Sequence, residues 1–541
     1  MENQIQLFDT TLRDGSQGEH ISFSLEDKLR IAHKLDAFGM HYIEGGWPGS
    51  NPKDILFFQK AKTERFEHAK LCAFGSTRRA SNPVERDANI RALVEADTPA
   101  VSIFGKSWLL HVRKALRISP EANLELIRDS VRYLKSKGRE VIFDAEHFFD
   151  GYRDDPDYAL AAALAAEEAG ADVLVLCDTN GGTITSQLSD IARIVVERVR
   201  TPLGIHAHND SDLAVANTLA AVEAGCVHVQ GTVNGYGERC GNANLCSVIP
   251  NLQLKMGISA VPDASIRRLT DLSRFVSDIA NLGQPGHFPF VGRSAFAHKG
   301  GVHVSAVMRT SEAYEHIDPA IVGNARRVLV SDLSGQSNVL YKANERGVDL
   351  EGYKKHVPQI VERLKDLEHE GYQFEAAEGS FDLLVRKMTG QWSDCFDLEG
   401  FRVLVERNQS GAPRSEASIR LRVGEKTAHT ASEGKGPVHA LDLALRKALR
   451  QFFPEIDAMR LSDYKVRDLN TSDGTHAKVR VLIESSTDRE TWSTVGVSDN
   501  ILEASWLALM DSFSYFLMKR GIVPKSVQSF ESETLKEEVT S

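Results

Sequence analysis

The sequence predicts an α/β protein in which a (β/α)8 barrel is followed by a mostly helical linker region and a C-terminal α+β domain with an internal repeat. Three observations lead to this fold class. Short apolar runs alternate with helical spacing over the first 280 residues, the pattern changes after that point, and a strands-then-helix pattern occurs twice toward the C-terminal end. The 541 residues of the chain suffice for about three domains.

Eight apolar runs in the first half are predicted to be buried parallel strands, because each is continuous rather than alternating. The segments between them have helical spacing, as in Glu26–Phe38 and Asp157–Ala169. Eight such units match a TIM barrel, and a doubly wound open sheet is the competing topology. Polar residues follow nearly every strand, and in a barrel those ends converge on one face, which favours the barrel. The eight runs are Ile5–Asp9, Tyr42–Gly45, Leu71–Gly75, Ala100–Phe104, Glu140–Asp144, Val173–Cys177, Leu203–Ala207 and Val227–Thr232.

The remainder of the chain divides into three parts by pattern. Residues 281–392 begin with an irregular connector and contain the helical segments Gly352–Leu367 and Phe381–Met388. Residues 393–522 hold the weak repeat, and residues 523–541 form a polar tail. The repeat consists of a strand and a helix in each copy, which predicts a small α+β domain with pseudo-twofold symmetry. Its elements are Ser418–Val423 with Val438–Phe452, and Ala477–Ile483 with Ile501–Leu517.

Composition excludes several classes of protein. The chain carries 64 Lys and Arg against 75 Asp and Glu, a net charge of −11, which argues against a general nucleic-acid binder. No apolar run reaches the roughly 18 residues of a membrane span, and the N-terminus lacks the pattern of a signal peptide. The six cysteines form no C-x-x-C pair. We therefore expect a cytoplasmic protein with neither nucleic-acid nor membrane partners.

A candidate metal site comes from two motifs at predicted strand ends. His206 and His208 are two residues apart, so both imidazoles point to the same side of a strand. Asp14, in the D-T-T-L-R-D-G run at residues 9–15, follows the first strand. One carboxylate and two imidazoles leave three open positions on an octahedral ion, which suits a substrate that chelates through two oxygens, such as a 2-oxo acid. Arg13 beside them would bind a carboxylate or a developing oxyanion.

Together with the G-E-R-C-G-N-A-N run at residues 237–244, these motifs resemble the 2-isopropylmalate synthase/homocitrate synthase family. The C-terminal repeat is similar to the regulatory domain of that family, through residues 434–438 and 495–498. Within the family, residues 143–152 and 297–303 look most like the citramalate synthase branch. The resemblance covers almost the whole chain.

This resemblance implies an acyltransferase that catalyses a Claisen condensation of acetyl-CoA with pyruvate to (R)-citramalate and CoA, in isoleucine biosynthesis. The alternatives are a 2-isopropylmalate synthase, which uses 2-oxoisovalerate in leucine biosynthesis, and a homocitrate synthase. A metal-dependent acyl-CoA lyase is an alternative of a different class, and the C-terminal repeat argues against it. A non-catalytic sensor is disfavoured because the set of site residues is complete.

The resemblance also assigns roles to individual residues. It implies a divalent metal, Mg²⁺ or Mn²⁺ with Zn²⁺ as an alternative, and acetyl-CoA as co-substrate. The catalytic residues are expected to be Arg13, Glu146, His303 and Tyr314; the substrate-binding residues Arg13 and Thr179; and the metal-binding residues Asp14, His206, His208 and Asn242. His303 would help to deprotonate acetyl-CoA, and Tyr314 would support it.

The parts beyond the barrel have expected roles of their own. The linker subdomains at 281–392 are expected to cover the active site, and in the family this segment can come from the partner subunit, which implies a homodimer. Residues 393–522 are expected to form a regulatory domain of the isopropylmalate synthase type that binds isoleucine. The alternative is that this domain only dimerises the enzyme.

Overall fold

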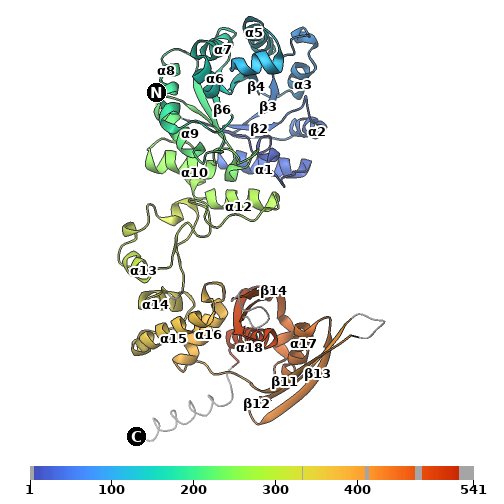
Figure 1. Ribbon diagram of the computed structural model, residues 1–541, viewed down its shortest axis with the longest axis vertical. Helices are drawn as coiled ribbons and strands as arrows, with labels where there is room; N and C mark the ends of the chain where they lie inside the picture. The colour runs from blue at the N-terminus through green and yellow to red at the C-terminus, as the bar shows by residue number, and fades with distance from the viewer. Residues whose placement is uncertain (1–4, 332, 408–412, 470–477, 523–541) are drawn as a thin grey trace. The chain divides into compact units, whose positions relative to one another are not determined.

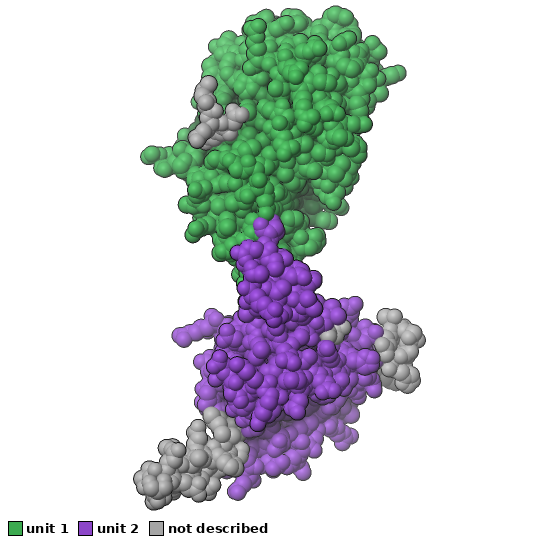
Figure 2. All heavy atoms as spheres, turned by 90° about the vertical axis from the view of Figure 1, so that its left-hand side faces the viewer, with its two compact units in different colours: residues 1–296, 317–326 green, residues 297–316, 327–541 purple. Residues whose placement is uncertain are grey.

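The computed structural model describes residues 5–331, 333–407, 413–469 and 478–522, so the polar tail expected at 523–541 lies outside the described residues. The chain forms two compact units (Figure 2). The first comprises Met1–Phe296 and Ile317–Arg326, and the second comprises Ala297–His316 and Arg327–Ser541. In the described parts, none of the helices is both long and apolar enough to cross a membrane.

The first unit contains a closed barrel of eight parallel strands in sequential order, with β1 paired to β8 (Figure 1). This confirms the predicted barrel, and the open sheet is wrong. All eight predicted strands are present, and two extend two residues further, to Lys106 and Glu146. The strands are β1 Gln6–Asp9, β2 Tyr42–Gly46, β3 Lys70–Ser76, β4 Ala100–Lys106, β5 Glu140–Glu146, β6 Val173–Asp178, β7 Leu203–Ala207 and β8 His228–Gly231.

The barrel strands are mostly apolar because both of their faces are buried. In β6, Val173, Val175 and Cys177 belong to a small cluster to which most of the strands contribute. Leu174 and Leu176 alternate with them and belong to the large cluster that includes the surrounding helices. Burying each of these leucines stabilises the fold by roughly 1.5–3 kcal/mol.

Helices surround the barrel, and their ends follow local sequence signals. Helix α1 begins with a reciprocal capping box between Ser24 and Asp27 and ends at Gly39, whose φ of 98° favours glycine. The helices of ten residues or more in this unit are α1 Leu25–Phe38, α2 Pro52–Ala61, α5 Pro120–Ser136, α7 Pro156–Glu168, α8 Thr185–Val196, α9 Ala214–Glu223 and α12 Leu269–Ile279; the shorter α3 Ala88–Ala96, α6 Phe148–Asp154 and α10 Leu245–Pro250 lie between them.

The second unit begins with a mostly helical region, as predicted. Its short strands β9 (Ala297–His298) and β10 (Arg327–Val328) pair in parallel. Pro358 lies in the first turn of α15, the position where proline is tolerated. The helices are α13 Gly301–Val307, α14 Gln336–Glu345, α15 Val357–Glu370 and α16 Glu378–Met388.

The C-terminal part of the second unit contains the predicted repeat, as two antiparallel three-stranded sheets, each followed by a helix. Ala477, the first residue of one predicted strand, lies outside the described residues. Ile419 and Leu445 of the first copy share one apolar cluster with Ile483 and Phe513 of the second. The first copy comprises β11 Asp397–Glu406, β12 Arg414–Val423, β13 Lys426–Gly434 and α17 Pro437–Leu449; the second comprises β14 Arg460–Asp468, β15 Val479–Ser486, β16 Thr491–Ser498 and α18 Ile501–Lys519.

Candidate metal centre and active site

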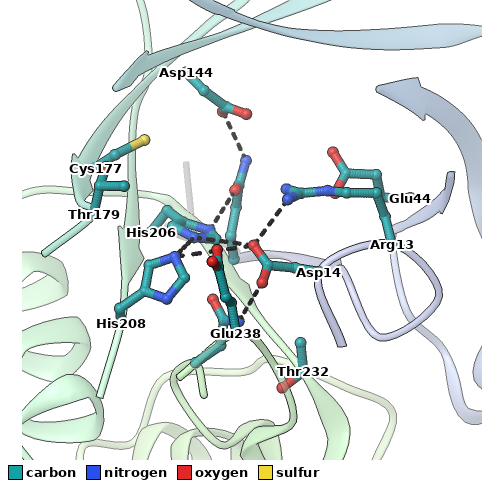
Figure 3. A network of polar contacts seen from close by, with 12 residues as sticks. Arg13, Asp14, Glu44, Asp144, Cys177, Thr179, His206, His208, Thr232 and Glu238 are labelled. Carbon is teal, nitrogen blue, oxygen red and sulfur yellow. Dashed lines mark hydrogen bonds and ion pairs between the residues drawn. The ribbon is translucent and has the colours of Figure 1, made fainter. Parts of the chain in front are cut away.

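Asp14, His206 and His208 converge at the carboxyl end of the barrel strands, as their positions in the sequence predicted (Figure 3). His206 lies in β7, His208 follows it directly, and Asp14 lies in the loop after β1. His206 Nε2 is 3.3 Å from His208 Nε2 and 3.7 Å from Asp14 Oδ2, and His208 Nε2 is 4.0 Å from the same oxygen. All three side chains are buried. The three potential ligand atoms thus surround a common point.

The loop that carries Arg13 and Asp14 is held in place by hydrogen bonds at its start. Asp9 accepts hydrogen bonds from the backbone N–H and the hydroxyl of Thr11, each at 2.9 Å. The Thr11 hydroxyl oxygen in turn accepts the N–H of Val233, also at 2.9 Å, which ties this loop to the segment after β8. The fixed geometry of the loop therefore sets the positions of the two functional side chains.

Asn242 has an orphaned oxygen that fits a metal ion. Its Nδ2 donates to Asp14 Oδ1 at 2.9 Å and to the carbonyl of Tyr236 at 3.3 Å. Within the described residues, its buried Oδ1 has no hydrogen-bond partner. A Cβ at Gly237 would lie 2.1 Å from Asn242 Nδ2, so only glycine permits this contact. The carboxylate and two imidazoles form a donor set that suits a divalent cation, and Asn242, which binds the carboxylate, has a further buried oxygen to offer.

Burial keeps both imidazoles in the form that binds metals. Burial, and after it the charge of His208, together lower the pKa of His206 to about 3, although Asp14 opposes the change. Burial also lowers the pKa of His208. Both rings are therefore neutral at physiological pH. Burial alone would raise the pKa of Asp14, but Arg13 and the two histidines more than offset this and lower it.

Arg13 is a fixed cation between two carboxylates. Its Nε donates to Glu44 Oε2 at 2.6 Å and its Nη1 donates to Asp14 Oδ2 at 2.8 Å, while the guanidinium lies 3.8 Å from the centre of the Phe74 ring. Burial opposes the charged form, but Glu44 and Asp14 outweigh it and raise the pKa of Arg13. The guanidinium is thus positively charged and oriented before any ligand arrives.

A cavity of about 200 Å³ opens beside these residues. Its wall includes the rings of Trp47, Phe74 and Phe104, and the polar residues Arg13, Asp14, Glu146, Thr179, His206 and His208. The remaining lining residues are Gln17, Asp144, Cys177, Glu238 and Arg239. The combination of convergent polar groups with an apolar wall is typical of a small-molecule site.

Thr179 and Glu146 both line this cavity. The Thr179 hydroxyl oxygen accepts the backbone N–H of His147 at 2.9 Å, so its own proton can be donated to a ligand. Its carbonyl accepts Nη2 of Arg239 at 2.7 Å, which fixes the loop. Glu146 forms an ion pair with Lys106 at the neighbouring strand end.

His303 and Tyr314 lie in the second unit. His303 is an exposed residue of α13, and Tyr314 is also exposed. Their rings stack with centroids 4.4 Å apart and an interplanar angle of 30°. The structure therefore brings these two residues together with each other, and their catalytic role stays a prediction.

Several residues of the site were not predicted from the sequence. Lys106 is a charged residue at the end of β4, and Gln230 is a polar residue within the buried strand β8. Each of these positions is a recognisable signal, because a barrel buries a charged or amide side chain in a strand only with a partner. The rings of Trp47, Phe74 and Phe104, here called the aromatic wall, gave no signal of a site in the sequence, since rings at strand ends are equally suited to packing.

Three family descriptions match the chain in succession. The family described as HMGL-like matches residues 4–276, homocitrate synthase post-HMGL domain-like matches residues 290–372, and the LeuA allosteric (dimerisation) domain matches residues 375–517.

Curated relatives are similar to the chain over nearly its whole length. The (R)-citramalate synthase of Aquifex aeolicus is 55% identical over 521 residues, which cover 96% of this chain and 99% of that protein. The (R)-citramalate synthase of Geobacter sulfurreducens is 56% identical over 516 residues, which cover 95% of this chain and 98% of that protein. A probable 2-isopropylmalate synthase of Methanopyrus kandleri is more distant, at 32% identity over 96% of this chain and 100% of that protein.

Proposed function

From the premise that the chain belongs to the (R)-citramalate synthases of the HMGL-like family, we propose that it condenses acetyl-CoA with pyruvate to form (R)-citramalate and CoA. The chain is an acyltransferase, and the acyl group becomes an alkyl group during the transfer. The observation that carries the proposed mechanism is the set of Asp14, His206 and His208 beside the fixed cation Arg13. Isoleucine biosynthesis is the proposed setting for this reaction.

We propose that Asp14, His206 and His208 hold a divalent cation, with Mg²⁺ or Mn²⁺ as the expected ion and Zn²⁺ as the alternative. When bound, such an ion would polarise the keto carbonyl of the 2-oxo acid and offset the charge of the new alkoxide. Asn242 supports the site by donating to Asp14, and its orphaned oxygen is available to the ion.

Arg13 and Thr179 are proposed to bind and orient the 2-oxo acid. The guanidinium uses Nε and Nη1 for the two carboxylates, which leaves Nη2 for a substrate oxygen. The Thr179 hydroxyl can donate to the substrate carboxylate because it already accepts a backbone N–H. Fixed donors of this kind stabilise developing negative charge without reorganisation.

The aromatic wall supports pyruvate as the acceptor. Trp47 contacts Phe74 and Phe104 edge-on, with ring centroids 5.4 Å and 5.7 Å away, so the three rings form one apolar surface. Trp47 is itself fixed, since its Nε1 donates to Asn89 at 2.7 Å. We propose that this apolar surface receives the methyl group of pyruvate.

A base is required because the methyl protons of acetyl-CoA are weakly acidic. We propose that His303 helps to remove the proton with Tyr314 in support, and that Glu146 acts at the reacting centre after the carbon–carbon bond forms, when water releases CoA from the thioester. Loss of a positioned base costs roughly 10²–10⁴-fold in rate.

The parts outside the barrel have proposed roles in assembly and control. We propose that residues 281–392 cover the active site of a homodimer and that residues 393–522 form a regulatory domain for isoleucine, in agreement with the match to the LeuA allosteric (dimerisation) domain. All six cysteines are free, which supports a cytoplasmic location.

The test of the proposed reaction is CoA thiol release from acetyl-CoA with pyruvate, 2-oxoisovalerate or 2-oxoglutarate as the acceptor. We expect the highest kcat/KM with pyruvate. A comparable or higher value with 2-oxoisovalerate would support the isopropylmalate reaction instead.

A further inference from the structure

Four buried polar side chains from four different barrel strands form a continuous line of hydrogen bonds that ends at His206. The Ser102 hydroxyl of β4 donates to Asp144 Oδ2 of β5 at 2.7 Å. Gln230 Nε2 of β8 donates to Asp144 Oδ1 at 3.0 Å. At its other end, Gln230 Oε1 lies 2.9 Å from His206 Nδ1 of β7. None of the four side chains is more than slightly exposed to solvent.

The chemistry of this line fixes which atom of His206 carries the hydrogen. Burial raises the pKa of Asp144 to about 6, so at neutral pH it is mainly a carboxylate, which can only accept hydrogen bonds. The end of Gln230 that faces Asp144 must then be its NH₂ group, and its oxygen must face His206. An amide oxygen also only accepts, so His206 Nδ1 bears the hydrogen and Nε2 presents a lone pair.

The two histidines of the candidate metal site differ in this respect. His206 Nδ1 has the partner just described, whereas the buried His208 Nδ1 has no hydrogen-bond partner within the part of the chain that the structure describes. Both Nε2 atoms face Asp14. One imidazole is therefore held by a dedicated line of side chains, and the other is not.

We propose that Gln230 is a positioning residue that, anchored by Asp144 and Ser102, holds His206 in the Nδ1–H tautomer with Nε2 directed at the metal. This inference rests on the proposed function, because it requires that Asp14, His206 and His208 bind a divalent cation. Partners that orient an imidazole ligand commonly change metal affinity by about 10- to 100-fold when they are removed.

The competing explanation is that Gln230 only fills the barrel interior. The substitution Gln230→Met keeps the length and approximate volume of the side chain but removes both hydrogen bonds. Gln230→Glu retains an acceptor for His206 Nδ1. A matched control is His228→Leu, two residues earlier on the same strand, because His228 is buried among Phe8 and Tyr42 and has no hydrogen bond to the site.

The test is titration of the metal-stripped full-length chain with Mn²⁺ by calorimetry, together with the visible absorption spectrum of the Co²⁺ form. We expect Gln230→Met to weaken Mn²⁺ binding by about 10- to 100-fold and to alter the Co²⁺ bands. Gln230→Glu should bind more tightly than Gln230→Met, and His228→Leu should match the wild type. Circular dichroism checks the fold of each variant, and Gln230→Leu replaces Gln230→Met if the latter does not fold.

The outcomes separate this inference from the function on which it rests. Unchanged Mn²⁺ affinity and Co²⁺ spectrum in a folded Gln230→Met would overturn the positioning role and leave the metal site intact. Absence of binding in the wild type would overturn the metal site and the positioning role together. Equal losses in Gln230→Met and His228→Leu would assign the effect to packing and overturn the inference.

Discussion

At the residue scale, the proposed role of Arg13 rests on the fixed position of its guanidinium. Its guanidinium is held by two carboxylates and by an aromatic face at once. A planar group with several donors can satisfy all of these contacts, whereas an ammonium group at the end of a flexible chain cannot. We therefore propose that Arg13 contributes a fixed orientation in addition to its charge.

The substitution Arg13→Lys tests the importance of this orientation, because it keeps the positive charge. We expect kcat with pyruvate to fall by roughly 10²–10³-fold, because lysine cannot hold Asp14 and Glu44 while meeting the substrate. Steady-state kinetics with both substrates varied provides the measurement. Arg78→Lys is the matched control, since Arg78 pairs with Asp129 and does not line the cavity. Equal kcat values in the two variants would contradict the role of Arg13.

Asp9 gives a prediction for stability. Burial raises its pKa to about 7 from 3.8, although the hydrogen bonds from Thr11 oppose the change. Between these two pH values the folded state retains a proton that the unfolded chain has released, so the contribution of Asp9 to stability falls as pH rises.

Asp9→Asn removes this dependence. We expect the Tm of the wild type to fall relative to that of Asp9→Asn as the pH is raised from about 5 to about 8. Thermal unfolding of both proteins at the two pH values measures it. A difference in Tm that is the same at both pH values would show that Asp9 does not titrate in this window.

At the scale of elements, the function follows from the ends of the barrel strands. Residues far apart in sequence meet because parallel strands end on one face, as Asp14 after β1 meets His206 on β7. The rings of Trp47, Phe74 and Phe104 come from three neighbouring strand ends in the same way. We propose that this wall limits the side chain of the 2-oxo acid.

The substitution Phe104→Ala should allow the cavity to accept a 2-oxo acid with a larger side chain. We expect the ratio of kcat/KM for pyruvate to that for 2-oxobutyrate to fall by about 10-fold or more, since one methylene in an apolar pocket accounts for roughly 10–200-fold discrimination. Competition between the two acids, with both products quantified, measures the ratio. Phe58→Leu, a buried change in α2, is the control. If both variants keep the ratio of the wild type, the wall does not set specificity.

The elements also show how far the sequence predicts the structure. The strands and the metal triad were predicted because continuous apolar runs and polar strand ends are local signals. The residues that hold the metal triad in place were not predicted. Gln230, for example, reaches Asp144 only because the barrel closes, which no local pattern encodes. Strands β4 and β5 were predicted two residues short because they end in the charged residues Lys106 and Glu146.

At the scale of the whole molecule, the proposed catalytic residues are divided between the two units, and the proposed regulatory domain belongs to the second. The metal-site residues lie in the first unit, and the stacked pair His303 and Tyr314 and the repeat domain lie in the second. Helix α17 begins at Pro437, directly after Lys435 and Gly436, so its first turn offers backbone N–H groups to a carboxylate. An effector can change activity only if it binds one conformation better than another.

Isoleucine is expected to bind the intact protein and to lower its rate. Calorimetry and thiol release are measured over one titration with isoleucine, and leucine and valine serve as matched controls. Inhibition by isoleucine at lower concentration than by the other two supports the regulatory role. If none of the three binds at millimolar concentration, the repeat domain is structural.

We propose that this barrel uses a metal held by Asp14, His206 and His208 to make (R)-citramalate. The most direct test follows product formation from acetyl-CoA and pyruvate by chiral chromatography, in metal-stripped wild type, in the same protein after addition of Mn²⁺, and in Asp14→Ala. We expect (R)-citramalate only in the second sample, with Asp14→Ala folded but free of metal. Full activity in the metal-stripped protein, or a product other than (R)-citramalate after reconstitution, would contradict the account.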